Sequence, residues 1–133
     1  MNEQEIRNIA AVGPGWLDIV VEATAQLREL DPDFTIIQIK EKFGGLRYYY
    51  MPTEGNNTAT RKAMDDVIRA AEGTCECTCE TCGNSGEFRN GGWMRTLCDA
   101  CEAAYQAKRK AVAALEAPHE PGCGCDPGGL YLG

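Results

Sequence analysis

The spacing of apolar residues predicts two amphipathic helices in the first part of the chain. The first lies between Gly13-Pro14-Gly15 and Asp31-Pro32, because a proline disfavours the helical conformation in the residue before it. Its apolar residues recur at helical intervals along one face: Trp16, Ile19, Val20, Ala23, Leu27 and Leu30. The second pattern runs from about Thr58 to Glu72, where we expect Gly73 to stop the helix. Ahead of both, Ile6 to Ala10 predict a short lead-in turn.

Two β-branched and aromatic segments between these helices are typical of strands. Phe34–Lys40 reads FTIIQIK, and the segment from Leu46 to Met51 reads LRYYYM. Paired glycines supply the positive φ angles of a tight turn, so we expect an antiparallel hairpin that reverses near Gly44 and Gly45. The predicted fold class is therefore α+β, with two helices packed on a hairpin.

The remaining patterns divide the chain of 133 residues into three parts. We expect a small α+β core over residues 1–73 and a treble-clef-like zinc module with a long C-terminal helix over 74–117. That final helix is predicted from about Asp99 to Leu115. Residues 118–133 form a tail rich in Gly, Pro and Cys, which we expect to be irregular.

Four of the eight cysteines have the spacing of a zinc site. Cys79-x2-Cys82 and Cys98-x2-Cys101 are separated by 15 residues. We expect a knuckle at the first pair, a hairpin over 87–97, and the second pair at the start of the final helix. Zn²⁺ in structural sites takes four tetrahedral ligands, so four thiolates leave no position for a reactive water. The sequence therefore predicts Zn²⁺ as a structural cofactor.

The other four cysteines form two Cys-x-Cys pairs, Cys75 with Cys77 and Cys123 with Cys125. We interpret them as ligands of a second zinc ion, for which His119 is a substitute ligand. The simpler interpretation is surface thiols, and a redox role for the pairs is a third.

Composition and charge narrow the function classes. The formal net charge is −7, which disfavours non-specific binding to nucleic acid because that depends on neutralising phosphates. The first residues lack a secretory signal and no apolar stretch is long enough to cross a membrane, so we expect a cytoplasmic protein.

The segment around the hairpin turn combines cations and aromatic residues. A partner could contact it through Lys40, Lys42, Arg47, Tyr48 and Tyr50, together with Trp93 near the zinc site. The simpler interpretation is that the aromatic side chains pack the hairpin on the helices and the lysines stay solvated.

The motifs GPGW, IKEKFGGLRYYY, CETCG and GGWMRTLCDAC together resemble an uncharacterised family of small proteins found in bacteriophages, prophages and their bacterial hosts. The resemblance covers about residues 13 to 102 and implies no established activity. The Cys-x-Cys pairs and the Gly/Pro tail depart from the family pattern.

Three classes of function remain. The first is a non-enzymatic phage-type protein that binds and modulates or inhibits a host protein, such as a component of a defence system. Its acidic residues could contact a basic partner or simply form a solvated face; they include Asp18, Glu22, Glu29, Asp31 and Asp33. The alternative is a nucleic-acid-binding zinc-finger module that uses Arg89, Arg95, Trp93 and the Lys108–Lys110 run. An enzyme is disfavoured, because the sequence offers no nucleophile–base pair, phosphate loop or open metal site. A nuclease pattern of Asp33 with Gln38-Ile39-Lys40 is spaced too closely.

Overall fold

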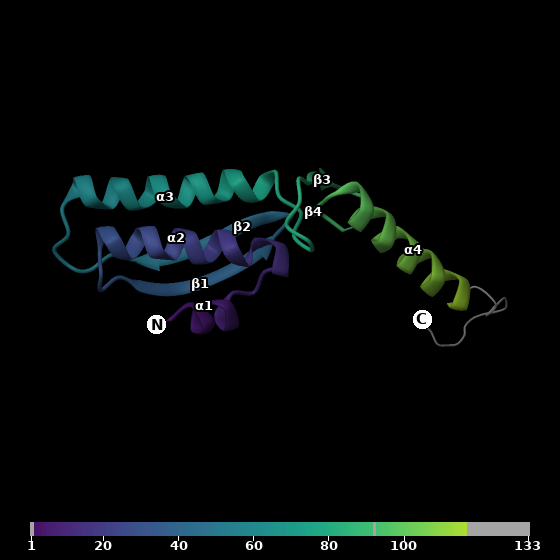
Figure 1. Cartoon of the computed structure of the whole chain (residues 1–133), viewed down its shortest axis with the longest axis horizontal. Coiled ribbons are helices and arrows are strands. Elements are labelled where there is room, and N and C mark those ends of the chain that lie inside the picture. The colour runs from purple at the N-terminus through teal and green to yellow at the C-terminus, as the bar shows by residue number, and fades with distance from the viewer. Residues whose placement is uncertain (1, 92, 117–133) are drawn as a thin grey trace. The chain divides into compact units, whose positions relative to one another are not determined.

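The computed structural model describes residues 2–91 and 93–116. The chain combines helices with two separate antiparallel hairpins, which confirms the α+β class (Figure 1). The elements are α1 (Glu3–Ile9), a 3-10 turn (Pro14–Trp16), α2 (Leu17–Leu30), β1 (Thr35–Lys42), β2 (Gly45–Met51), α3 (Thr58–Glu76), β3 (Glu87–Arg89), β4 (Arg95–Leu97) and α4 (Asp99–Glu116). The chain divides after Cys101 into two compact units, and the first holds every element before α4. Within the described ranges no helix is long and apolar enough to cross a membrane.

The N-terminal segment forms a complete helix rather than the predicted lead-in turn. Asn2 accepts a hydrogen bond from the Glu5 amide at 2.9 Å, and the Asn2 amide donates to the Glu5 carboxylate at 2.7 Å. This reciprocal pair satisfies amides that a helix start otherwise leaves open. Ile6 then anchors α1 in the core at 5% exposure.

The hairpin has the predicted antiparallel pairing, but its turn is displaced by one residue. Ile39 pairs with Tyr48 and Lys42 with Gly45, so Gly45 already belongs to the strand. The turn residues are Phe43 and Gly44, with φ angles of 56° and 77°. Phe43 therefore takes a conformation that side chains rarely adopt, and the predicted glycine pair supplies only one of the two turn positions.

The predicted end of the second helix at Gly73 is wrong, because α3 passes through this residue. The helix continues to Glu76 and carries Cys75 into the core, where it is wholly buried. Gly73 does not adopt a positive φ, and a side chain there would meet no atom within 4 Å. A glycine ends a helix when it takes the left-handed conformation itself, and here Gly73 stays helical.

The core forms where α2 and α3 cover one face of the hairpin. Its largest fully buried side chains come from separate elements and include Trp16, Leu27, Ile39 and Met64. One buried polar pair crosses this core, because the hydroxyls of Thr24 and Tyr48 lie 2.6 Å apart. Burial of such apolar surface is the main term that holds the helices on the strands.

Asp31 is buried where α2 ends. Its carboxylate accepts hydrogen bonds from the Thr53 amide at 2.7 Å, the Thr53 hydroxyl at 2.5 Å and the Asn56 side chain at 2.6 Å. The bonds from Thr53 dominate in lowering the Asp31 pKa below its usual range. Asp31 therefore ties α2 to the loop before α3, and it does not belong to the exposed acidic face expected from the sequence.

Candidate metal centre

The structure brings together the four cysteines of the two Cys-x2-Cys pairs. The sulfur atoms of Cys79, Cys82, Cys98 and Cys101 all lie within 4.8 Å of one another. Cys79 is buried, Cys82 is exposed, and the other two are half-buried. This group could hold one metal ion, and the predicted ligand set is the one the fold assembles.

Each pair of cysteines comes from a tight local structure. In the first pair the Gly83 amide donates to the Cys79 carbonyl at 3.0 Å, and Gly83 has a φ of 86°. In the second pair the Cys101 amide donates to the Cys98 sulfur at 3.4 Å at the start of α4. Between them β3 and β4 pair antiparallel, with Glu87 opposite Leu97. The knuckle and the start of α4 thus supply two sulfurs each, and the β3–β4 hairpin connects them.

The GPGW segment packs directly against this knuckle, which the sequence did not reveal. The Gly15 amide donates to the Glu80 carbonyl at 2.7 Å, and the Trp16 indole donates to the Thr78 carbonyl at 2.8 Å. A side chain on Gly13 or Gly15 would overlap the backbone of the knuckle. Both glycines are therefore required by close backbone approach rather than by helix initiation alone.

Glu80 and Thr96 join the two halves of the centre. The Glu80 amide donates to the Thr96 carbonyl at 2.9 Å, and the Thr96 amide donates to the Glu80 carboxylate at 2.7 Å. Burial raises the Glu80 pKa, which the Thr96 hydrogen bond opposes. Glu80 also lies 3.8 Å from the Arg95 guanidinium. These hydrogen bonds join the knuckle to the hairpin in addition to any ion that the four sulfurs hold.

The electrostatics of the four thiols favour a bound cation. Burial raises the pKa of Cys79, but backbone amides of Cys82, Cys98 and Thr81 outweigh it and lower the pKa to about 6. The neighbouring sulfurs of Cys98 and Cys79 raise the pKa of Cys101 to about 12. Several thiolates this close repel one another, so a positive charge among them is needed before all four ionise.

The remaining cysteines lie elsewhere. Cys75 is fully buried, and desolvation followed by the nearby Glu80 charge raises its pKa to about 12. Cys75 therefore behaves as a small core residue, whereas Cys77 is exposed. Cys123, Cys125 and His119 lie outside the described residues, so the second zinc site stays a prediction.

The predicted partner-binding residues divide into two groups. Lys42, Arg47 and Trp93 are exposed, and Lys40 is half-buried. Tyr48, in contrast, is 4% exposed and lies in the core, so its side chain offers no contact surface in this structure. The Tyr50 hydroxyl donates to Asp65 at 2.5 Å, which ties β2 to α3. The aromatic side chains at 48 and 50 thus follow the simpler, structural interpretation.

Two of the cations suggested for nucleic-acid contact, Arg89 and Arg95, have intramolecular partners. The Arg89 guanidinium lies 2.8 Å from the Asp99 carboxylate, and Arg95 stacks over the Trp93 ring at 4.5 Å.

Comparison with known proteins finds no matching family model, no matching curated protein and no matching solved structure.

Proposed function

We propose that this protein is a non-enzymatic binding protein whose Cys79, Cys82, Cys98 and Cys101 hold one structural Zn²⁺ in a treble-clef-like module. The mutual approach of the four sulfurs within 4.8 Å carries the proposal. All-thiolate tetrahedral sites are typical of structural zinc, and four protein ligands leave no coordination position for substrate or water. The metal would then stabilise the module, and function would reside on the surface.

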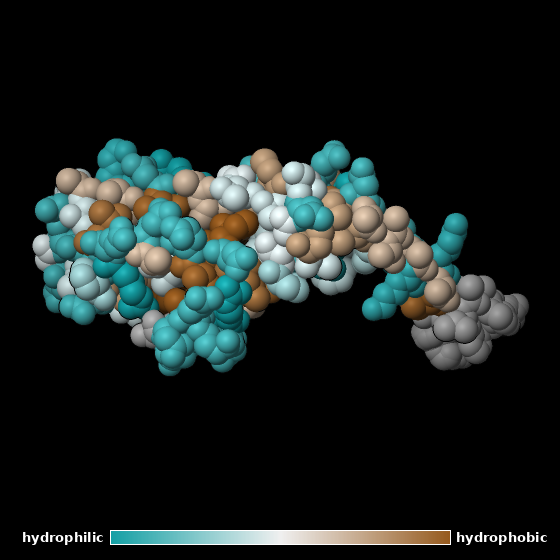
Figure 2. Space-filling model, in the orientation of Figure 1, coloured by the Kyte–Doolittle hydropathy of each residue, from teal (hydrophilic) through white to brown (hydrophobic). Residues whose placement is uncertain are grey.

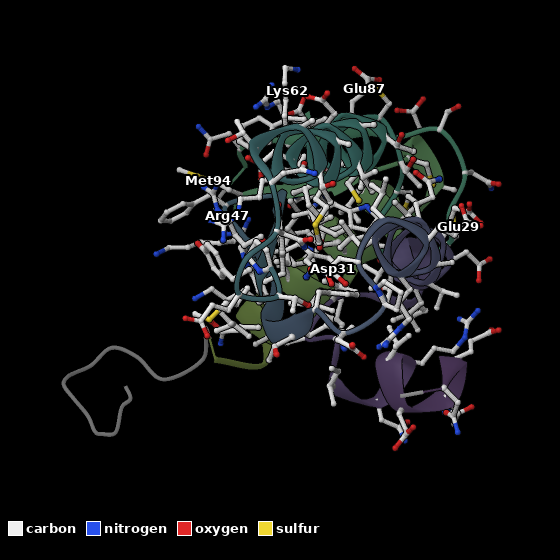
Figure 3. All side chains as sticks on the ribbon, turned by 90° about the vertical axis from the view of Figure 1, so that its left-hand side faces the viewer. Glu29, Asp31, Arg47, Lys62, Glu87 and Met94 are labelled. Carbon is white, nitrogen blue, oxygen red and sulfur yellow. The ribbon has the colours of Figure 1, made fainter. Side chains whose placement is uncertain are left out.

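The exposed side of the β1–β2 hairpin is the surface that supports binding of a protein partner. Ile37, Tyr49 and Met51 are 58%, 47% and 59% exposed on adjacent strands. Arg47 lies on β2 among them, and Figure 3 shows Arg47 and Met94 projecting on the same side of the ribbon. Apolar side chains gathered on a surface beside an arginine are typical of protein contacts.

We infer a host protein as the partner and modulation or inhibition as the effect. The resemblance to phage and prophage proteins supports this inference, and so does the net charge of −7, which suits a basic partner surface. A component of a bacterial defence system fits that setting, and the site of action would be the host cytoplasm.

The test has two arms. Metal analysis of the purified full chain should give zinc bound by the four cysteines, and Cys79→Ser plus Cys82→Ser should abolish it. Affinity capture from a bacterial host lysate should recover one stoichiometric protein with the wild type and lose it with Arg47→Glu. Lys62→Glu, a matched charge reversal at an exposed α3 position, should retain the partner. Failure to recover any stoichiometric protein would contradict the proposal.

The alternative function is a nucleic-acid-binding zinc module. It draws support from the cations near the centre, but Arg89 and Arg95 already face acidic groups at Asp99 and Glu80. A mobility shift with short DNA or RNA that weakens steeply with salt would favour this alternative over the protein partner.

A further inference from the structure

A channel with an apolar floor runs between α2 and α3, on the side of the core away from the hairpin's exposed face. Its volume is about 310 Å³. The floor is formed by Ile19 and Ala23 from α2 and by Val67 and Ala70 from α3. Figure 2 shows hydrophobic surface over these two helices among hydrophilic residues. The two helices therefore leave part of their shared apolar surface uncovered.

The channel exists because short side chains face each other there. Ala23 and Ala71 are buried where the helices pack, whereas Ala70 is an exposed residue of the channel floor. Ile19 and Val67 are only partly buried against the core. Alanines lower the surface between the ridges of two helices, which lets a third helix approach at the usual interaxial distance of about 8–10 Å.

The rim of the channel is acidic. Asp18 and Glu22 lie one turn apart on α2, and the described residues that line the channel include no lysine or arginine. Asp18 has a side chain that is 89% exposed and lies 2.7 Å from the Arg7 guanidinium, while Glu22 accepts a bond from Gln26 at 3.0 Å. Because Arg7 pairs with Asp18 while the partner of Glu22 is the neutral Gln26, the rim beside the apolar floor keeps a net negative charge.

We propose that this channel binds an amphipathic α-helix of a partner protein, with small or branched apolar residues on one face and Lys or Arg beside them. The apolar face would cover Ile19, Ala23 and Val67, and the cations would reach Asp18 and Glu22 along their aliphatic stems. An anionic ligand is disfavoured by the rim. The inference rests on the proposed protein-binding function but uses a different surface from the hairpin.

The probe is an alanine-based peptide of about 18 residues, long enough to be helical, with leucines along one face and lysines flanking them. Titrated into the isotope-labelled, zinc-loaded full chain, it should shift amide resonances of α2 and α3 around the channel, with saturation. A matched peptide with glutamates in place of the lysines should not bind. Absence of saturable shifts with the lysine peptide would overturn the proposal.

Two substitutions locate the contact. Ala70→Trp should fill the channel from an exposed position, and Glu22→Lys should reverse the charge at the rim. Each substitution should lower the affinity for the lysine peptide about tenfold or more, equivalent to about 1.4 kcal/mol. Glu54→Lys, the same charge change in an exposed loop, should have no comparable effect. Unchanged affinity in both channel variants would place the peptide elsewhere and reject the site.

A peptide of residues 99–116 of this chain tests a second copy as the occupant. If it binds the channel and the lysine peptide does not, the site serves self-association and the partner proposal is wrong. Arg47→Glu, which tests the proposed function on the hairpin, should leave peptide binding unchanged. Loss of host-protein capture and loss of peptide binding are therefore separate outcomes.

Discussion

The Thr96 hydroxyl donates a 2.7 Å hydrogen bond to the Gly44 carbonyl, although 52 residues separate them in the chain. Phe88 also lies beside Gly44, at the tip of the β1–β2 hairpin. The turn of the large hairpin is thereby fastened to the small hairpin of the candidate metal centre. The fold and the centre consequently stabilise each other through a few buried contacts.

Replacing Thr96 with valine should weaken this connection. The change keeps the shape of the side chain but leaves the Gly44 carbonyl without its donor, which should lower the free energy of unfolding by about 1–2 kcal/mol. Urea unfolding of the zinc-loaded protein measures the loss. Thr81→Val, at an exposed threonine in the knuckle, should change stability by much less. Equal effects of the two substitutions would mean that the hydroxyl bond contributes little.

Two glycine-to-alanine substitutions should act in opposite directions. In Gly15→Ala the new Cβ would overlap the Cys79 carbonyl and the Gly83 amide, so we expect a loss of about 2–3 kcal/mol or more and weaker metal retention. In Gly73→Ala the Cβ enters open space within α3, where alanine is favoured by about 0.5–1 kcal/mol. Thermal unfolding compares them. A neutral Gly15→Ala would show that the close backbone approach is not required.

The hydrogen bonds that the buried Asp31 carboxylate accepts from Thr53 and Asn56, here called the Asp31 clamp, should make the free energy of unfolding depend on pH in the acidic range. Because its folded-state pKa is lowered, chiefly by the side-chain and backbone bonds from Thr53, the carboxylate stabilises the fold above the ordinary Asp pKa of about 4. This contribution should be lost as pH falls through the lowered pKa. Asp31→Asn should therefore be less stable than wild type at neutral pH, and the difference should shrink in acid. Asp33→Asn, at an exposed position, is the control; a difference between Asp31→Asn and wild type that does not change with pH would contradict the clamp.

Removal of the metal should loosen the centre before the helical core. With a chelator, amide hydrogen exchange should accelerate at Cys79, Glu80 and Thr96, and at Gly15, whose amide bonds to the Glu80 carbonyl. Amides around Met64 in the middle of α3 should keep their protection, because that side chain is wholly buried in the core. Unchanged exchange at Glu80 and Thr96 would show that the module folds without metal.

The sequence alone determined most of the elements and the ligand group, although it predicted only a turn where α1 forms. Helical periodicity located α2, β-branched composition located the hairpin strands, and the Cys-x2-Cys spacing identified the four sulfurs. These features are local, since each depends on residues a few positions apart. Local rules were nonetheless insufficient at two positions. Helix α3 continues through Gly73 instead of ending there, and in the hairpin turn Phe43 has the positive φ that was expected of a glycine.

Only the tertiary structure decided the roles of residues that depend on contacts between distant segments of the chain. It placed Tyr48 in the core rather than on a surface, turned Asp31 into a buried clamp, and set Gly15 against the knuckle backbone. It also left a channel open between α2 and α3, which neither helix reveals by itself. The physical reason is that burial and hydrogen bonding between distant segments depend on the packed arrangement, whereas composition and spacing report only on neighbours along the chain.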